Sequence, residues 1–254
     1  MTTRPNGSLY TKIDNKIATI EFGHPQSNSF PGELLDRLTQ EIDVLSQNDK
    51  VNLILLKSEG AGAFCAGASF DELLMIANEE NGKFFFSGFA KVINDMRKSS
   101  KIIVGRIHGK AVGGGVGLVA ACDYALASVD AAVKLSELAI GIGPFVIEPA
   151  VSRKIGKAAM SEMALAPHGW KNAYWAKEKG LYAQVFDSVN DLDKELKIFC
   201  SKLAEYNPEA LSEMKKVLWE NTQNWDTLLF ERAEISGRLV LSDFTKTALA
   251  KFKK

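Results

Sequence analysis

The segment that most constrains the fold is residues 110–123, with the sequence KAVGGGVGLVAACD. It follows the apolar run 102–107 and continues into small aliphatic residues, a pattern that predicts a strand, a glycine turn and the start of a helix. Gly113, Gly114 and Gly115 leave main-chain N–H groups uncovered by side chains. At a helix N-terminus such groups lack intrahelical partners and lie at the positive end of the helix dipole. The segment therefore predicts a site for an oxygen that becomes negative during a reaction.

Length and composition indicate one sizeable core and exclude several kinds of partner. The chain has 254 residues, of which 46% are hydrophobic. Lysine plus arginine and aspartate plus glutamate number 31 each, so no net charge favours nucleic acid or an anionic membrane. Cys65, Cys122 and Cys200 are widely spaced and odd in number, which is typical of a reducing compartment. The N-terminus lacks the apolar stretch of a signal peptide, and no apolar run approaches about 18 residues. We expect a cytoplasmic protein without a membrane insertion.

Strand and helix patterns alternate in the first part of the chain, and helical patterns dominate the last part. Strands are predicted at 8–13 and 17–22 as a hairpin, and then at 51–56, 102–107, 123–127, 132–135 and 184–187. Helices are predicted from 32 onward, in two pieces over 71–96, within 150–182 and through most of 191–252, with a long glycine-rich connection over 136–149. We therefore expect an α/β core over residues 1–190, followed by a helical region over 191–254.

A second segment of small residues accompanies the triple glycine. Cys65, Ala66, Gly67 and Ala68 follow the predicted strand 51–56 and also leave N–H groups bare. Two donors that converge on one carbonyl oxygen form an oxyanion hole. A tight strand-to-helix turn without a catalytic role is the alternative. Nucleotide-binding glycine motifs fit poorly, because no Gly-Lys-Ser/Thr follows and the spacing differs from the dinucleotide fingerprint.

Three motifs together resemble the enoyl-CoA hydratase/isomerase (crotonase) family: FCAGAS at 64–69, HGKAVGGGVGLVAACD at 108–123 and KLSELAIGIGP at 134–144. The resemblance implies an α/β spiral of ββα units with a C-terminal helical trimerisation region, assembled as a homotrimer or hexamer. It also implies an acyl-coenzyme A thioester as substrate and no separate cofactor. The family's oxyanion donors match the N–H groups of Ala68 and Gly114. The remaining substrate or CoA contacts that the resemblance suggests are at Asn28, Ala66, Gly67, Gly113 and Phe145.

The sequence retains one of the two glutamates that the family's hydratases use. Glu137 matches the downstream position, in an apolar setting where burial would raise the pKa of its carboxyl toward neutrality. Without the resemblance, Glu137 could equally be a helix cap or an ion-pair partner. The upstream position is Gly117, which has no group for proton transfer. A single carboxylate suffices for a double-bond isomerisation, so we expect this reaction in preference to hydration.

Three alternatives stay open at this point. Glu148, or Asp71, could replace the missing acid of a hydratase. The chain could also hydrolyse an acyl-CoA thioester, but a related acyl-CoA hydrolase carries an aspartate where this chain has Phe145. We expect the ring of Phe145 to narrow the pocket and to exclude water from it. The chain could also be a CoA-thioester-binding scaffold without activity, a possibility that retained Glu137 and both small-residue turns disfavour.

Other candidate groups have simpler structural explanations. His24, His108 and His168 lack ligand spacing, so no metal site is expected, and a structural hydrogen bond is the expected role of His108. Cys65 has no histidine base beside it in sequence and is interpreted as a small buried filler. The phenylalanine cluster at 84–86 and 89 is expected to belong mainly to the core.

Overall fold

A six-stranded sheet forms the centre of the computed structural model, which describes residues 6–251. The strand order is β1-β2-β3-β4-β6-β8, antiparallel between β1 and β2 and parallel elsewhere. A separate pair, β5 and β7, is also parallel. The strands are β1 (Ser8–Asp14), β2 (Ile17–Gly23), β3 (Leu53–Ser58), β4 (Ile102–Ile107), β5 (Ala111–Val112), β6 (Tyr124–Ser128), β7 (Val133–Lys134) and β8 (Gln184–Phe186).

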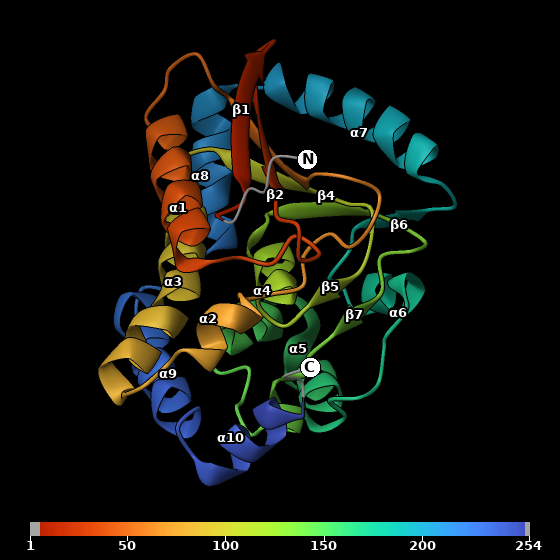
Figure 1. Ribbon diagram of the computed structural model, residues 1–254. Helices are drawn as coiled ribbons and strands as arrows, with labels where there is room; N and C mark the ends of the chain where they lie inside the picture. Colours follow the sequence, from red (N-terminus) through yellow and green to blue (C-terminus); the bar gives the residue numbers. More distant parts are fainter. Residues whose placement is uncertain (1–5, 252–254) are drawn as a thin grey trace.

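Helices surround this sheet and form the lower part of the molecule in Figure 1. They are α1 (Gly32–Ser46), α2 (Phe70–Leu74), α3 (Glu79–Lys98), α4 (Gly114–Ala121), the 3₁₀ helix η1 (Glu137–Ile140), α5 (Glu148–Leu165), α6 (Ala173–Glu178), α7 (Val189–Ala204), α8 (Pro208–Leu218), α9 (Trp225–Leu239) and α10 (Asp243–Ala250). The predicted α/β fold is confirmed.

Successive side chains of the parallel strands point to opposite sides of the sheet, and helices cover both sides. Leu53 of β3 and Val104 of β4 contact the apolar face of α7, which crosses the sheet at the upper right of Figure 1. The intervening residues Ile54 and Ile103 belong to the main core with α1, α3 and α4. The sheet is therefore a rigid layer between helices.

Several boundaries differ from the prediction, among them the start of one strand and the end of one connection. The strand expected at 51–56 begins at Leu53, because the N–H of Val51 donates to the carbonyl of Asn48 in a turn. The connection expected over 136–149 contains η1 and ends where α5 begins at Glu148. Apolar content alone cannot separate a turn from the first residues of a buried strand.

A buried ion pair fastens the helical region to the sheet. Lys215 of α8 donates to Asp123 Oδ2 at 2.9 Å, and each side chain is 2% exposed. Trp219 Nε1 donates to the other carboxylate oxygen at 2.6 Å. Because every charge is paired and hydrogen-bonded, the polar cluster is compatible with burial.

Helices α9 and α10 pack onto the core of the same chain. A Cβ on Gly82 of α3 would lie 2.7 Å from the Cα of Gly237 in α9, so the two helices meet where neither carries a side chain. Helix α10 lies against η1, where Thr245 and Phe244 approach Gly141. The oligomerisation role expected for 191–254 stays a prediction, and residues 1–5 and 252–254 of the two predicted regions lie outside the described residues. No helix between residues 6 and 251 is long and apolar enough to cross a membrane.

Candidate active site

Main-chain hydrogen bonds join the two small-residue turns. The N–H of Val112 donates to the carbonyl of Cys65 at 2.9 Å, and the N–H of Phe64 donates to that of Lys110 at 2.9 Å. A Cβ on Gly115 would lie 2.5 Å from the Cys65 oxygen, so only glycine permits this approach. The segments are adjacent although some 45 residues separate them in sequence.

Two glycines set the direction of the turns. Gly67 has φ +90°, and a Cβ there would lie 2.9 Å from the Val112 oxygen and 3.3 Å from the Gly114 nitrogen. Gly113, the N-cap of α4, has φ +53°. Both φ values fall in the region that favours glycine, which explains why the turns require it.

Two main-chain donors are left over at this junction. Within the described part of the chain, no main-chain hydrogen bond outside helices and strands uses the N–H of Ala68. Gly114 is the first residue of α4, so its N–H has no intrahelical acceptor. Ala68 and Gly114 line the same cavity of about 150 Å³. A carbonyl oxygen bound there would meet two donors at the positive end of α4.

The small β5–β7 pair places Glu137 beside these donors. The N–H of Gly113 donates to the carbonyl of Lys134 at 2.9 Å, which holds the end of β7 against the glycine turn. Glu137 begins η1 three residues later, and a Cβ on Gly113 would lie 2.7 Å from Glu137 Oε1. The carboxylate therefore lies directly against the turn.

The environment of Glu137 raises its pKa to about 7. Burial is the main cause, and hydrogen bonds from the main chain of Glu137 and Ser136 oppose it. Part of the residue is accessible, but Oε2 is buried and has no hydrogen-bond partner among residues 6–251. The burial of this oxygen agrees with burial as the main cause of the raised pKa. A carboxyl with this pKa can both accept and release a proton near neutral pH.

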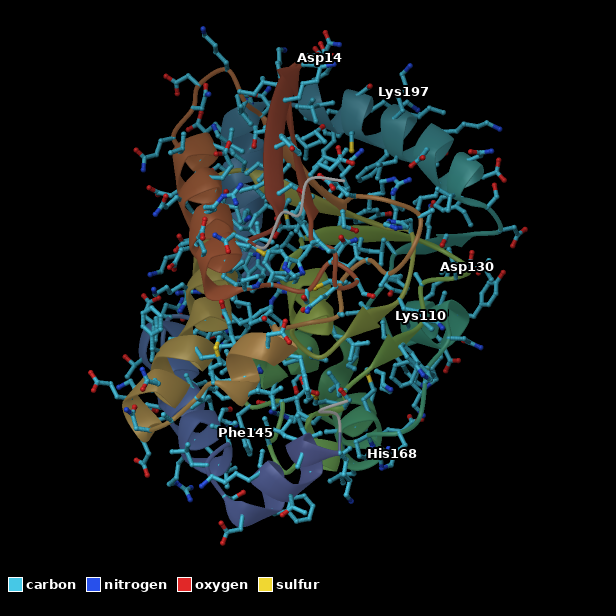
Figure 2. The ribbon with its side chains drawn as sticks, viewed as in Figure 1. Asp14, Lys110, Asp130, Phe145, His168 and Lys197 are labelled. Atoms are coloured by element: carbon cyan, nitrogen blue, oxygen red, sulfur yellow. The ribbon has the colours of Figure 1, made fainter. Side chains whose placement is uncertain are left out.

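Apolar side chains form most of the cavity wall. Phe89 lies against the glycine turn at the start of α4, since a Cβ on Gly114 would lie 2.4 Å from its Cζ. The ring of Phe145 folds back over Gly143 in the same way, with a corresponding distance of 2.4 Å. Figure 2 shows Phe145 in the part of the molecule where α2 and α9 lie, and both helices contribute to the wall. Such a wall fits an apolar ligand group.

The structure brings most of the predicted site residues to this cavity. Those that line it are Ala66, Gly67, Ala68, Gly113, Gly114, Glu137 and Phe145. Asn28 and Glu148 do not line it.

Asn28 braces loops instead. Its Nδ2 donates to the carbonyls of Glu59 and Ala63, both at 2.9 Å, and its Oδ1 accepts from the N–H of His24 at 3.0 Å. These bonds occupy the side chain, so Asn28 joins its own loop to the segment that precedes the 64–69 turn.

Glu148 is committed to ion pairs outside the cavity. Ser152 Oγ donates to its Oε1 at 2.5 Å, Lys157 pairs with the same oxygen, and Arg232 lies 3.9 Å from Oε2. Burial raises the pKa of Glu148, but hydrogen bonds from Lys157 and Ser152 and the two cationic charges outweigh it and hold the pKa below its usual range. Asp71 also lies outside the cavity, where it accepts from Gln26 at 2.6 Å. Neither carboxylate is placed as a substitute acid.

The remaining sequence interpretations have mixed outcomes. Burial raises the pKa of Cys65 to about 12 and keeps it a thiol, consistent with a filler. The expected hydrogen bond of His108 is wrong, because neither buried ring nitrogen has a partner among the described residues. Phe85, Phe86 and Phe89 line the cavity, whereas Phe84 is 66% exposed. Between residues 6 and 251, no group of three histidine, cysteine or acidic side chains could hold a metal.

The cavity residues that were not among the predicted site residues include one serine and one isoleucine. Ser236 lines it from α9, about 100 residues beyond Glu137, and is brought there by the close helix crossing at Gly237. Ile147 lines it from the residue that precedes α5. No motif marks either position.

Comparisons with known proteins agree with this geometry. The enoyl-CoA hydratase/isomerase family model matches residues 12–246. A probable enoyl-CoA hydratase of Bacillus subtilis is 26% identical over 212 residues, which are 82% of this chain and 81% of that protein. A peroxisomal Delta(3,5)-Delta(2,4)-dienoyl-CoA isomerase of Arabidopsis thaliana is 27% identical over 221 residues, which cover 81% of this chain and 78% of that protein. The crystal structure of an enoyl-CoA hydratase from Bacillus halodurans superposes with a TM-score of 0.88 at 21% identity, covering 96% of this chain and 99% of that one.

The similar proteins include a hydratase and an isomerase at nearly equal identity, so the comparisons favour neither reaction. The match of the family model over almost the whole chain, the shared fold and the cavity between two glycine turns lead to one conclusion: the chain belongs to the enoyl-CoA hydratase/isomerase (crotonase) family.

Proposed function

We propose that the protein is an enoyl-CoA isomerase that moves a double bond from the Δ3 to the Δ2 position of an acyl-CoA thioester. The Glu137 carboxylate removes a proton from C2 of the substrate, and the electron pair moves into a dienolate with its charge on the thioester oxygen. The protonated Glu137 then gives the same proton to C4, which leaves the double bond between C2 and C3. No water is consumed and no second acid is needed.

The N–H groups of Ala68 and Gly114 stabilise the dienolate in this proposal. The thioester carbonyl would lie between them, where its oxygen gains negative charge as the proton leaves C2. Each well-placed donor of this kind contributes about 2.7–4 kcal/mol to transition-state stabilisation. Proton transfer through a positioned carboxylate adds a factor of about 10²–10⁴.

The observation that carries the proposal is the polar content of the cavity. Among the described residues that line it, Glu137 is the one titratable side chain, and Ser136 and Ser236 contribute hydroxyls. Position 117 is glycine, and Glu148 is engaged in ion pairs. Hydration needs a group that holds and activates water in addition to the group that protonates C2, and the described residues that line the cavity include no second carboxylate for it.

Assays of the purified full chain on two substrates test the proposal. With trans-3-hexenoyl-CoA we expect conversion to the 2-enoyl thioester, and with crotonyl-CoA we expect slower hydration. Faster hydration than isomerisation would contradict the proposal. Absence of turnover with both substrates, with binding of the CoA thioester intact, would favour the alternative of a CoA-thioester-binding scaffold without activity.

Replacement of Phe145 by glycine is expected to lower the ratio of isomerase to hydratase activity. The ring covers Gly143 and narrows the cavity, so its loss admits water near the bound acyl group. Both activities are measured on the same preparation. Phe84→Gly is the matched control, because Phe84 is exposed and outside the cavity, and its ratio should stay at the wild-type value. An unchanged ratio in Phe145→Gly would show that the ring does not control water.

A further inference from the structure

The space beside Gly117 is filled by another side chain. Gly117 lies in the second turn of α4, where its N–H donates to the carbonyl of Gly113 at 3.2 Å. A Cβ at this position would lie 2.4 Å from Ile147 Cγ2 and 2.8 Å from Ile147 Cβ. The next atom, Ile93 Cδ1, would lie 3.7 Å away, at ordinary contact distance. Ile147 is therefore the single close obstacle among the described residues.

Ile147 has little freedom to move aside. It is 4% exposed, and its β-branched side chain restricts rotation about χ1. Its main chain is fixed as well, since it precedes the first residue of α5 and its carbonyl accepts from the N–H of Val151 at 3.0 Å. A side chain at 117 would have to displace Ile147 rather than share its space.

Ile147 also belongs to the cavity wall, so it joins position 117 to the site. Gly117 is three residues along α4 from the proposed donor Gly114, and Ile147 contacts the cavity that Gly114 and Glu137 line. A carboxylate that projected from position 117 toward the substrate would take the volume that Ile147 now occupies. In its place the substrate meets a hydrocarbon surface that cannot hold water.

We propose that Ile147 is a specificity-determining residue that keeps the site a proton-transfer site by filling the place of a water-activating carboxylate. This inference rests on the proposed function and adds a chemical consequence to it. Gly117 lacks the second acid and Ile147 fills the space beside it, so an acid introduced at 117 alone would not restore hydration. Restoring an acid at 117 therefore requires removal of Ile147 as well.

The restored reaction would use both carboxyl groups. A carboxylate at 117 would take a proton from water while the water oxygen bonds to C3, the C2–C3 π electrons form the C1–C2 double bond of an enolate, and the carbonyl π electrons move to the thioester oxygen. Protonated Glu137 would then give its proton to C2 as the enolate returns to a thioester. One water is added in total, and the proton left at 117 returns to Glu137 by exchange with solvent.

A double-mutant cycle tests the steric half of the proposal without any activity assay. We expect Gly117→Ala to lower the melting temperature, and Gly117→Ala with Ile147→Gly to lose less than the sum of the two single changes. Ile147→Ala should relieve the clash only in part, because the 2.8 Å approach to Cβ remains. Ile142→Gly, a cavity residue not among the atoms nearest to position 117, is the control and should combine additively with Gly117→Ala. Additive losses for the Ile147 pair would overturn the steric claim.

Gain of hydration tests the functional half. Turnover of crotonyl-CoA is compared among wild type, Gly117→Glu, Ile147→Gly and the double variant, each with a melting curve that reports folding. We expect the double variant to hydrate at least tenfold faster than either single variant. Equal hydration by Gly117→Glu alone, or none by a folded double variant, would overturn the inference. Isomerisation of trans-3-hexenoyl-CoA by the wild type is measured in parallel, so that failure of the proposed function is recognised separately.

Discussion

Replacing Glu137 with glutamine is expected to lower kcat for isomerisation of 3-enoyl-CoA by about 10²–10⁴-fold, with a much smaller change in KM. Glutamine has nearly the same shape but cannot take a proton from C2. The oxyanion donors and the apolar wall remain, so substrate binding should persist. Steady-state kinetics together with titration of an unreactive acyl-CoA separate the two effects.

The stability of the same variant gives an independent control. The pKa of Glu137 is about 7 in the folded chain and 4.5 in the unfolded chain. Between these pH values the folded chain binds more protons than the unfolded chain, so the wild type loses folding stability as the pH rises from 4.5 to about 7. The difference between the two pKa values corresponds to a loss of about 3 kcal/mol in the free energy of unfolding at pH 8. Below about pH 4.5 this loss is absent. Glu137→Gln should therefore be more stable than the wild type at pH 8 and similar to it at low pH. Denaturant unfolding at both pH values checks this. A variant that is inactive and less stable at pH 8 would indicate a structural role for Glu137.

Replacing Ala68 with proline is expected to lower kcat by about 10²–10³-fold, because proline lacks the N–H that the proposed oxyanion hole requires. This N–H forms no main-chain hydrogen bond within the described turns and loops, so the loss should appear in the transition state more than in the fold. Kinetics on 3-enoyl-CoA measure the effect, and a melting curve checks that the variant is folded.

Ala68→Gly is the matched control for this variant. It retains the N–H and removes only a methyl group, so its kcat should stay close to that of the wild type. A folded Ala68→Pro variant with near-normal kcat would show that the thioester oxygen is not bound at this turn.

The fold could be predicted largely from local pattern. Alternating apolar residues specify the hairpin of β1 and β2, and the run at 102–107 coincides with β4. Asn207 and Pro208 mark the start of α8, where the Asn207 side chain accepts from the N–H groups of Glu209 and Ala210. Such signals depend on neighbours in sequence, which is why they are legible without coordinates.

The site could be predicted at positions where the backbone conformation requires one residue type, glycine. Gly67 and Gly113 have positive φ and closely approach other atoms, and Glu137 follows the strand that pairs beside them. Contacts between distant segments leave no such mark. That Ile147 lies over Gly117, and that Ser236 reaches the cavity, depends on how α4, α5 and α9 pack. The suggestion that Glu148 is a second acid rested on its apolar neighbours in sequence. Those neighbours do not reveal that Lys157 and Arg232 lie beside its carboxylate.

The fate of a label in the substrate tests the central claim most directly. A 3-enoyl-CoA carrying two deuterium atoms at C2 is isomerised in ordinary water, and the position of deuterium in the product is read by NMR. Transfer by one buried carboxyl, whose Oε2 has no partner in the described residues, predicts product with deuterium at C4 as well as at C2. Product without any deuterium at C4, or hydrated product alone, would contradict a single acid that carries the proton between the two carbons.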